Sequence, residues 1–290
     1  MGWHATYVRV PSRDRVELAV HDLGGGDHGR PPLLLAHATG LLARAYQPLA
    51  DRLTDAFHVW GVDLRAHGES TTPENGDLSW PRMADDVLAV VDELTPPTGR
   101  PYAVGHSMGG AALVLAELAR PGTFERLYLY EPVLIPAGLL PAEAEDNPMS
   151  AAARRRRPSF ETRASAYETY AGKPPLDEMS EASLQAYVEH GLVDQADGTV
   201  ALACTPDHEA ETFAGAAVAG AFERLAEVAC PVVVARGSLD SPGPAGFAAQ
   251  AAAALPHGTL VVLDGLGHFG PLADEDAVAR SIREAFAPGT

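Results

Sequence analysis

The sequence has few cysteines, few basic residues and no long apolar run, and each shortage excludes a class of protein. Only two of its 290 residues are cysteines, Cys204 and Cys230, and their spacing suits neither a metal site nor a disulfide scaffold, so we expect buried free thiols. Lysine and arginine number 21 against 39 acidic residues, and the resulting net charge of −18 disfavours nucleic acid and anionic membranes as partners. No apolar stretch is long enough to span a bilayer.

The N-terminus and the composition favour an ordinary globular protein. Residues 1–4 do not open a basic segment followed by an apolar run, as a signal peptide would. Hydrophobic residues make up 46% of the chain and charged residues 21%, which argues against disorder. We therefore expect a cytoplasmic protein. Plentiful Ala, Gly, Pro and Arg with little Lys indicate a bacterial genome rich in G and C, and the sequence does not indicate an oligomeric state.

Short apolar segments alternate with segments of helical periodicity along most of the chain. Residues 33–36 form an unbroken apolar run, typical of a strand buried on both faces. Residues 80–94 have apolar side chains at helical spacing. The pattern predicts further strands at residues 7–10, 15–20, 58–62, 126–130, 231–235 and 259–263, and further helices at residues 44–53, 111–120, 244–255 and 274–286. This alternation predicts an α/β fold, with a mostly parallel sheet and helices on both of its faces.

The alternation stops between residues 136 and 226. This stretch is polar, rich in Ala, Glu and Arg, and has no strongly apolar strand. Because strands resume after it, we expect a helical cap inserted after the sixth strand. The predicted domains are a core of residues 1–135 and 227–290 and a cap of residues 136–226.

A Gly-His-Ser-Met-Gly sequence at residues 105–109 lies between an apolar strand from residue 102 and a helix. This is the strand-turn-helix context that gives a G-x-S-x-G motif its meaning, with Ser107 at the apex. Gly105 and Gly109 are small where backbones must pass closely. The helix directs free backbone N–H groups toward whatever Ser107 attacks.

A serine hydroxyl needs a base within hydrogen-bond reach, and the base needs an orienting acid. His268 follows the last predicted strand and Asp240 follows the strand before it. The chain order Ser107, Asp240, His268 is the order expected when each residue follows a strand of such a sheet. These three residues are our predicted nucleophile, acid and base.

The identity of the acid stays open at this stage. Glu131 also follows a strand, one position earlier in the sheet, and is the alternative acid. Asp240 precedes Ser241-Pro242, so it can also be read as a turn former. We favour Asp240. The oxyanion needs two preorganised N–H donors, and we expect them to be the backbones of Met108 and Thr39.

Together these motifs resemble the α/β-hydrolase superfamily, over about residues 7–286 except the cap. The resemblance rests on residues 37–40 (His-Ala-Thr-Gly), 61–70 (Gly-Val-Asp-Leu-Arg-Ala-His-Gly-Glu-Ser), 105–110 (Gly-His-Ser-Met-Gly-Gly), 237–240 and 267–269 (Gly-His-Phe). It implies an eight-stranded sheet whose second strand is antiparallel, a lid and a cofactor-free Ser–His–acid site. It also implies a structural pair between Asp63 and Arg65. One departure is Ala38, where the family commonly has Gly.

Other polar clusters have structural interpretations. Asp63 and His67 flank Arg65, which would repel a cation, so we expect no metal there. Asp85 and Asp86 are expected on the solvated side of their helix. Residues 154–157 are four arginines, read either as a solvated face paired with acids such as Glu161 or as a cap patch for an anionic substrate. Five cap aromatics are expected to line the pocket or to form the cap core: Phe160, Tyr167, Tyr170, Tyr187 and Phe213.

The predicted function is that of a serine hydrolase, which forms an acyl-enzyme with an ester, thioester or lactone. We expect a small-molecule substrate with an apolar part, and no cofactor. One alternative is a cyclase, a lyase or a C–C bond hydrolase that uses the same pocket. Another is a silent ligand-binding module that kept the site.

Overall fold

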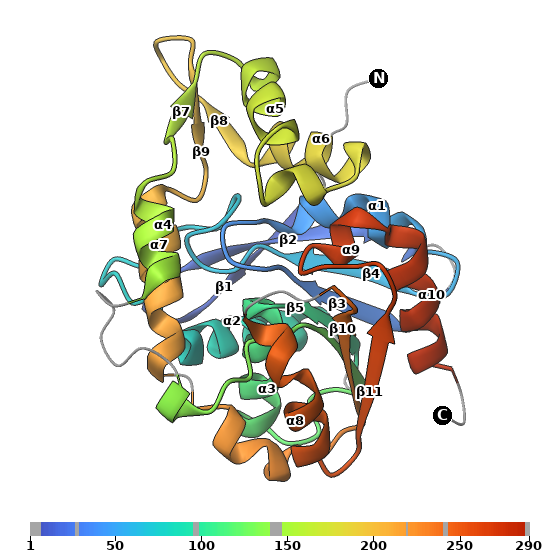
Figure 1. Ribbon diagram of the computed structural model, residues 1–290. Helices are drawn as coiled ribbons and strands as arrows, with labels where there is room; N and C mark the ends of the chain where they lie inside the picture. Colours follow the sequence, from blue (N-terminus) through green and yellow to red (C-terminus); the bar gives the residue numbers. More distant parts are fainter. Residues whose placement is uncertain are drawn as a thin grey trace.

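An eight-stranded sheet forms the centre of the protein, in the order β1-β2-β4-β3-β5-β6-β10-β11 (Figure 1). The computed structural model describes residues 7–26, 29–94, 99–139, 147–218, 220–239 and 243–287. The strands are β1 (Tyr7–Pro11), β2 (Glu17–Gly24), β3 (Pro32–Ala36), β4 (His58–Val62), β5 (Tyr102–His106), β6 (Arg126–Tyr130), β10 (Val232–Gly237) and β11 (Gly258–Leu263). Strand β2 is antiparallel to both neighbours and the other pairs are parallel, so the predicted fold class is confirmed.

Helices cover both faces because the strand side chains alternate between two apolar cores. In β3, Leu34 and Ala36 face one core, and Leu33 and Leu35 face the other. The first core is closed by α2 (Trp80–Leu94), α3 (Met108–Ala119) and α8 (Ala248–Ala254). The second is closed by α1 (Gln47–Asp51), α9 (Gly270–Ala273), α10 (Glu275–Ala285) and part of the cap. The central strands are thus buried on both faces, as their apolar runs predict.

Two predicted helices are each divided into a 3-10 turn and a short α-helix. Residues 44–53 form η3 (Ala43–Tyr46) and then α1, and residues 244–255 form η9 (Pro244–Phe247) and then α8. Another 3-10 turn, η1 (Arg13–Arg15), joins the first two strands. Within the described residues, no helix combines the length and the apolar character that a membrane crossing requires.

The segment between β6 and β10, which are neighbours in the sheet, is the one predicted to be a cap, and we call it the cap below (Figure 1). Its α-helices are α4 (Pro148–Arg154), α5 (Arg163–Ala171), α6 (Glu181–His190) and α7 (Pro206–Ala214). Its 3-10 turns are η4 (Ala137–Leu139), η6 (Leu176–Glu178), η7 (Gly215–Val218) and η8 (Phe222–Glu227). It also contains a three-stranded antiparallel sheet of β7 (Ser159–Phe160), β9 (Val200–Leu202) and β8 (Leu192–Asp194), which the sequence pattern does not predict. Strands of two or three residues are too short to show a periodicity.

Candidate active site

Ser107 lies at the turn between β5 and α3, in a backbone conformation that residues other than glycine rarely adopt. Its φ is 54° and its ψ is −115°, and the residue is buried. Its N–H donates to the carbonyl of Tyr130 at 3.0 Å, which ties the turn to β6. A Cβ at Gly109 would lie 2.3 Å from the Ala36 carbonyl oxygen, so only glycine lets the new helix pass β3 this closely. The predicted elbow is therefore present, and its strain presents the serine side chain at the end of the sheet.

His268, in the loop between β11 and α9, is hydrogen-bonded to a buried carboxylate. Its Nδ1 lies 2.7 Å from Oε2 of Glu131, whose side chain is fully buried. The other carboxylate oxygen, Oε1, accepts the N–H of Gly237 at 3.0 Å. Glu131 directly follows β6 with φ 40°. The described residues offer the Nε2 atom of His268 no hydrogen-bond partner, so it remains free for a proton from the pocket side.

The structure thus brings the alternative acid, Glu131, to His268. The favoured acid, Asp240, lies outside the described residues. Both candidates follow neighbouring strands, β6 and β10. Glu131 has the geometry that an orienting acid needs: it is buried, it is held by a backbone N–H, and it lies within hydrogen-bond distance of the imidazole.

The two predicted oxyanion donors are Met108, which directly follows the serine, and Thr39. Met108 is the first residue of α3, where a backbone N–H has no partner inside the helix. Thr39 belongs to the loop after β3 and lines the same pocket as Ser107 and His268. Within the described part of the chain, the Thr39 N–H donates no hydrogen bond, and it is available to a ligand.

Two buried histidines fix the loop that carries Thr39. The Nδ1–H of His37 donates to the carbonyl of Ala38 at 2.8 Å, and its Nε2 accepts the N–H of Leu64 at 3.0 Å. His67 accepts the N–H of Gly40 at 3.1 Å. Burial lowers the pKa of both rings, that of His67 to about 3, so both remain neutral acceptors at physiological pH. This geometry agrees with a loop-ordering role for His37.

A second buried network joins this loop to the backbone of His268. The N–H of Ala38 donates to the Tyr46 hydroxyl at 3.2 Å, and that hydroxyl donates to Nδ1 of His106 at 2.7 Å. Nε2–H of His106 donates to the His268 carbonyl at 2.9 Å. Tyr46 could not be identified from the sequence, because neither its spacing nor its neighbours distinguish it from a core tyrosine.

Two structural expectations about charged residues are wrong. Asp63 does not pair with Arg65: it accepts from His21 at 3.0 Å, while Arg65 binds Asp86 through two hydrogen bonds of 2.7 and 2.8 Å. Asp86 is fully buried rather than solvated, whereas its neighbour Asp85 is partly exposed and pairs with surface arginines. A helical periodicity of apolar residues cannot reveal that one acidic residue faces a buried guanidinium.

A pocket of about 450 Å³ opens above Ser107 and His268 and is roofed by the cap. Four of the five predicted aromatics line it, while Tyr167 packs against the neighbouring apolar core. Its further lining residues are Ala38, Thr39, Gly40, Leu41, Met149, Ala152, Ala153, Arg155, Arg156, Arg157, Thr169, Lys173, Pro174, Pro175, Leu176, Glu209 and Phe269. The pocket is therefore mostly apolar, with cations on its cap side.

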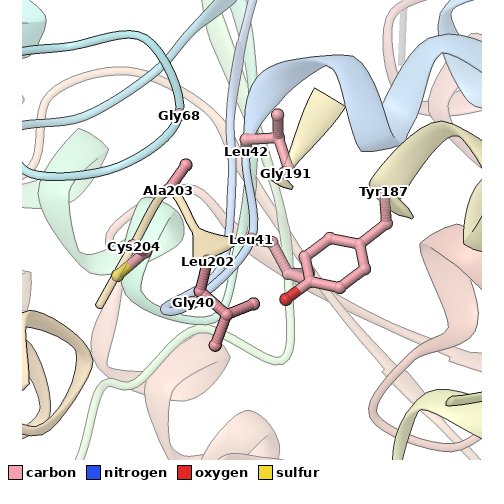
Figure 2. Close-up of a pocket in the computed structure, with 9 residues that line it drawn as sticks. All are labelled: Gly40, Leu41, Leu42, Gly68, Tyr187, Gly191, Leu202, Ala203 and Cys204. Atoms are coloured by element: carbon pink, nitrogen blue, oxygen red, sulfur yellow. The ribbon is translucent and has the colours of Figure 1, made fainter. Parts of the chain in front are cut away.

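The cap closes tightly on the loop after β3. Figure 2 shows Tyr187 reaching from α6 toward Leu41, with Gly191 beside Leu42. The space enclosed there measures about 10 Å³, which admits at most a single water molecule. The cap and the loop that carries Thr39 are therefore packed as one unit.

A hydrolase site consists of a serine at an elbow, a histidine bonded to a buried carboxylate, and a loop whose backbone N–H is free to bind the oxyanion. The sequence matches the alpha/beta hydrolase family over residues 33–281. The chain belongs to this family. The predicted family is thereby confirmed.

Individual relatives match this chain over different extents, and the chain spans about a third of the length of the curated relatives that it matches first. The 2-(acetamidomethylene)succinate hydrolase of Mesorhizobium japonicum is 34% identical over 107 residues, or 37% of this chain and 36% of the relative. The crystal structure of E-2-(acetamidomethylene)succinate hydrolase covers 97% of this chain and 98% of its own, with a TM-score of 0.81 and 24% identity. A thermophilic esterase from Thermogutta terrifontis covers 97% of both chains, with a TM-score of 0.73 and 24% identity. At this identity the solved structures establish the fold alone.

Proposed function

We propose that the protein is a serine hydrolase that forms an acyl-enzyme with an ester, thioester or lactone. Ser107 is the nucleophile, His268 the base and Glu131 the acid, with Asp240 as the rival for the last role. The hydrogen bond of 2.7 Å between His268 and the buried Glu131 carries the proposal. In the neutral ring this bond favours the tautomer with its proton on Nδ1, which leaves Nε2 free to accept the serine proton.

In the acylation step the Ser107 oxygen attacks the substrate carbonyl carbon while its proton moves to Nε2 of His268. Negative charge develops on the carbonyl oxygen, and the N–H groups of Met108 and Thr39 stabilise it there. When the tetrahedral intermediate collapses, the bond to the leaving group breaks and the imidazolium gives that group its proton. Glu131 stabilises the imidazolium during the step.

Deacylation repeats the sequence with water in place of the serine hydroxyl. His268 takes a proton from the water, the hydroxide oxygen bonds to the acyl carbon, and the bond to Ser107 breaks. The proton returns to the serine oxygen and the acid product leaves. The name of one relative, a hydrolase that is 34% identical over 107 residues, supports hydrolysis of this kind.

The substrate is a small molecule with an apolar part, bound between the core and the cap. The aromatic and aliphatic lining of the pocket of about 450 Å³ supports this size and character. We also propose residues 136–226 as the cap domain, with residues 1–135 and 227–290 as the core.

The Ser107→Ala variant tests the proposal. We expect it to lower turnover of 4-nitrophenyl acetate by at least ~10⁴-fold, with the circular dichroism spectrum unchanged. A fluorophosphonate, which requires an activated hydroxyl, should label the wild type once, on the peptide that contains Ser107. Ser159→Ala, a cap serine outside the pocket lining, is the matched control. Undiminished turnover in Ser107→Ala, or a label on another residue, would refute the assignment.

A further inference from the structure

The cap side of the pocket gathers positive charge in a strongly acidic protein. Arg155, Arg156, Arg157 and Lys173 line it, and Glu209 is the one carboxylate among the described lining residues. In the whole chain the balance is the reverse, with 39 acidic residues against 21 basic ones. Lys173 is the only lysine in the sequence. The pocket therefore has the opposite charge balance from the chain as a whole.

One of the four cations is already neutralised. Arg156 forms an ion pair with Glu209 of α7 and donates to the Tyr187 hydroxyl at 2.8 Å. A Cβ at Gly40 would lie 2.5 Å from Oε1 of Glu209, so this pair rests directly on the loop beside Thr39. Arg156 therefore holds the cap onto the loop, and a ligand cannot use its charge without breaking that pair.

The other three cations have no acidic partner in the described chain. Neither Arg155 nor Lys173 forms an ion pair or a side-chain hydrogen bond with a described residue, and both are exposed. The Nε of Arg157 donates to the Ser159 carbonyl at 2.8 Å, and its guanidinium lies 4.7 Å from the centre of the Phe160 ring. Its two terminal nitrogens make no hydrogen bond to a described residue, so they are left for a ligand.

Arg154, the first arginine of the run, behaves differently. It lies outside the pocket lining and forms an ion pair with Glu211 of α7 at 2.6 Å. The acids that pair with the run therefore come from α7 and not from Glu161. The arginine that faces away from the pocket has an acidic partner, and the two exposed arginines that face the pocket have none.

We propose that the substrate is an acyl compound whose far end carries an anionic oxygen group, a carboxylate or a phosphate, held by Arg155, Arg157 and Lys173. Guanidinium groups bind such anions through paired N–H donors, and the ammonium adds a point charge. The apolar residues that line the same pocket accommodate the carbon chain. This inference rests on the proposed function for the chemistry at Ser107, but the anion site itself is independent of that chemistry.

A pair of esters tests the inference by kinetics. Mono-4-nitrophenyl adipate and methyl 4-nitrophenyl adipate share one leaving group and one chain, and differ in the charge of the far end. We expect the wild type to favour the anionic ester in kcat/KM by at least ~10-fold, or ~1.4 kcal/mol. The triple variant Arg155→Gln/Arg157→Gln/Lys173→Gln should bring the ratio close to one, whereas Arg154→Gln should leave it unchanged. A wild-type ratio of one or below, or a ratio that the triple variant does not alter, would overturn the inference.

Equilibrium binding separates this inference from the proposed hydrolysis. By titration calorimetry on the Ser107→Ala protein, we expect 4-phenylbutyrate or 3-phenylpropylphosphonate to bind at least ~10-fold more tightly than neutral 4-phenylbutyramide. The anion that binds more tightly shows whether the site prefers a carboxylate or a phosphate-like group. Bound anion should also slow acetylation of Lys173, which mass spectrometry can follow because no other lysine competes. Equal affinity for the amide and both anions would overturn the anion site, even in a protein whose Ser107 hydrolyses esters.

Discussion

The Glu131→Gln substitution tests the arrangement around His268 most sharply, because the structure predicts how the new amide must sit. Gln has the same size and shape as Glu, so the buried site can keep its packing. The N–H of Gly237 requires an acceptor, which pins the amide oxygen at the position of Oε1. The amide NH₂ then faces Nδ1 of His268, where a carboxylate oxygen accepted a hydrogen bond before.

Two donors cannot share that hydrogen bond, so the imidazole must move its proton to Nε2. In this tautomer the ring cannot accept the proton of Ser107. A comparable carboxylate-to-amide change in a serine protease lowers kcat about 10⁴-fold. We expect a loss of the same order here, equivalent to about 5 kcal/mol in the activation free energy.

The assay is the initial rate of 4-nitrophenyl acetate hydrolysis, measured with the thermal unfolding midpoint of each variant. Glu117→Gln is a matched control, since Glu117 is also buried and accepts backbone N–H groups from Gly122, Thr123 and Phe124. It should affect stability without a comparable change in kcat. If Glu131→Gln keeps more than a tenth of the wild-type kcat while Asp240→Asn loses about 10³-fold, the acid is Asp240 and the reasoning is wrong.

Three further variants test the surroundings of the site. Tyr46→Phe leaves the N–H of Ala38 and Nδ1 of His106 without a partner, so we expect a loss of about 2 kcal/mol in unfolding free energy together with a lower kcat. Tyr128→Phe, which removes a buried hydroxyl bonded to Ser281, should lower stability only. Equal kcat values for the two variants would contradict the network. Gly109→Ala should cost about 3 kcal/mol or more in urea unfolding because its Cβ would meet backbone, whereas Gly246→Ala, with open space around it, should be neutral. Burial lowers the pKa of His67 from 6.5 to about 3. Below pH 6.5 the unfolded chain therefore binds a proton at this residue that the folded chain does not bind. The free energy of unfolding falls as the pH drops below 6.5. Between pH 8 and pH 5 this difference in proton binding lowers the free energy of unfolding by about 2 kcal/mol, and His67→Asn should remove that part of the pH dependence of urea unfolding. An unchanged pH dependence in the variant would refute the low pKa of His67.

The parts of the fold that could be predicted are those in which burial dictates the residue pattern. Strands β4 and β6 and helix α2 have the predicted bounds, because each presents an apolar run or stripe to a continuous core. The elbow could be predicted for a related reason. A sharp strand-to-helix turn allows only small residues at Gly105 and Gly109, and two glycines at this spacing can be recognised in the local sequence.

The parts that could not be predicted depend on contacts between residues far apart in the chain. The short cap strands are held by one another and not by a periodic pattern. The buried pair of Arg65 and Asp86 and the hydroxyl of Tyr46 between Ala38 and His106 each depend on which side chains the tertiary fold brings together. Local propensity has no information about such partners.

The choice of acid shows most clearly why sequence order alone does not define this site. Strands β6 and β10 are adjacent and parallel, so a residue that follows either strand begins at the same edge of the sheet. Glu131 uses this adjacency directly: its N–H donates to Ala235 of β10 at 2.8 Å, and its side chain accepts from Gly237 at the end of that strand. The position after β6 can therefore supply a carboxylate to a histidine after β11 without any change of topology. Chain order leaves two positions for the acid. The described contacts support Glu131, a residue with φ 40° whose fully buried carboxylate lies within hydrogen-bond distance of both Gly237 and His268.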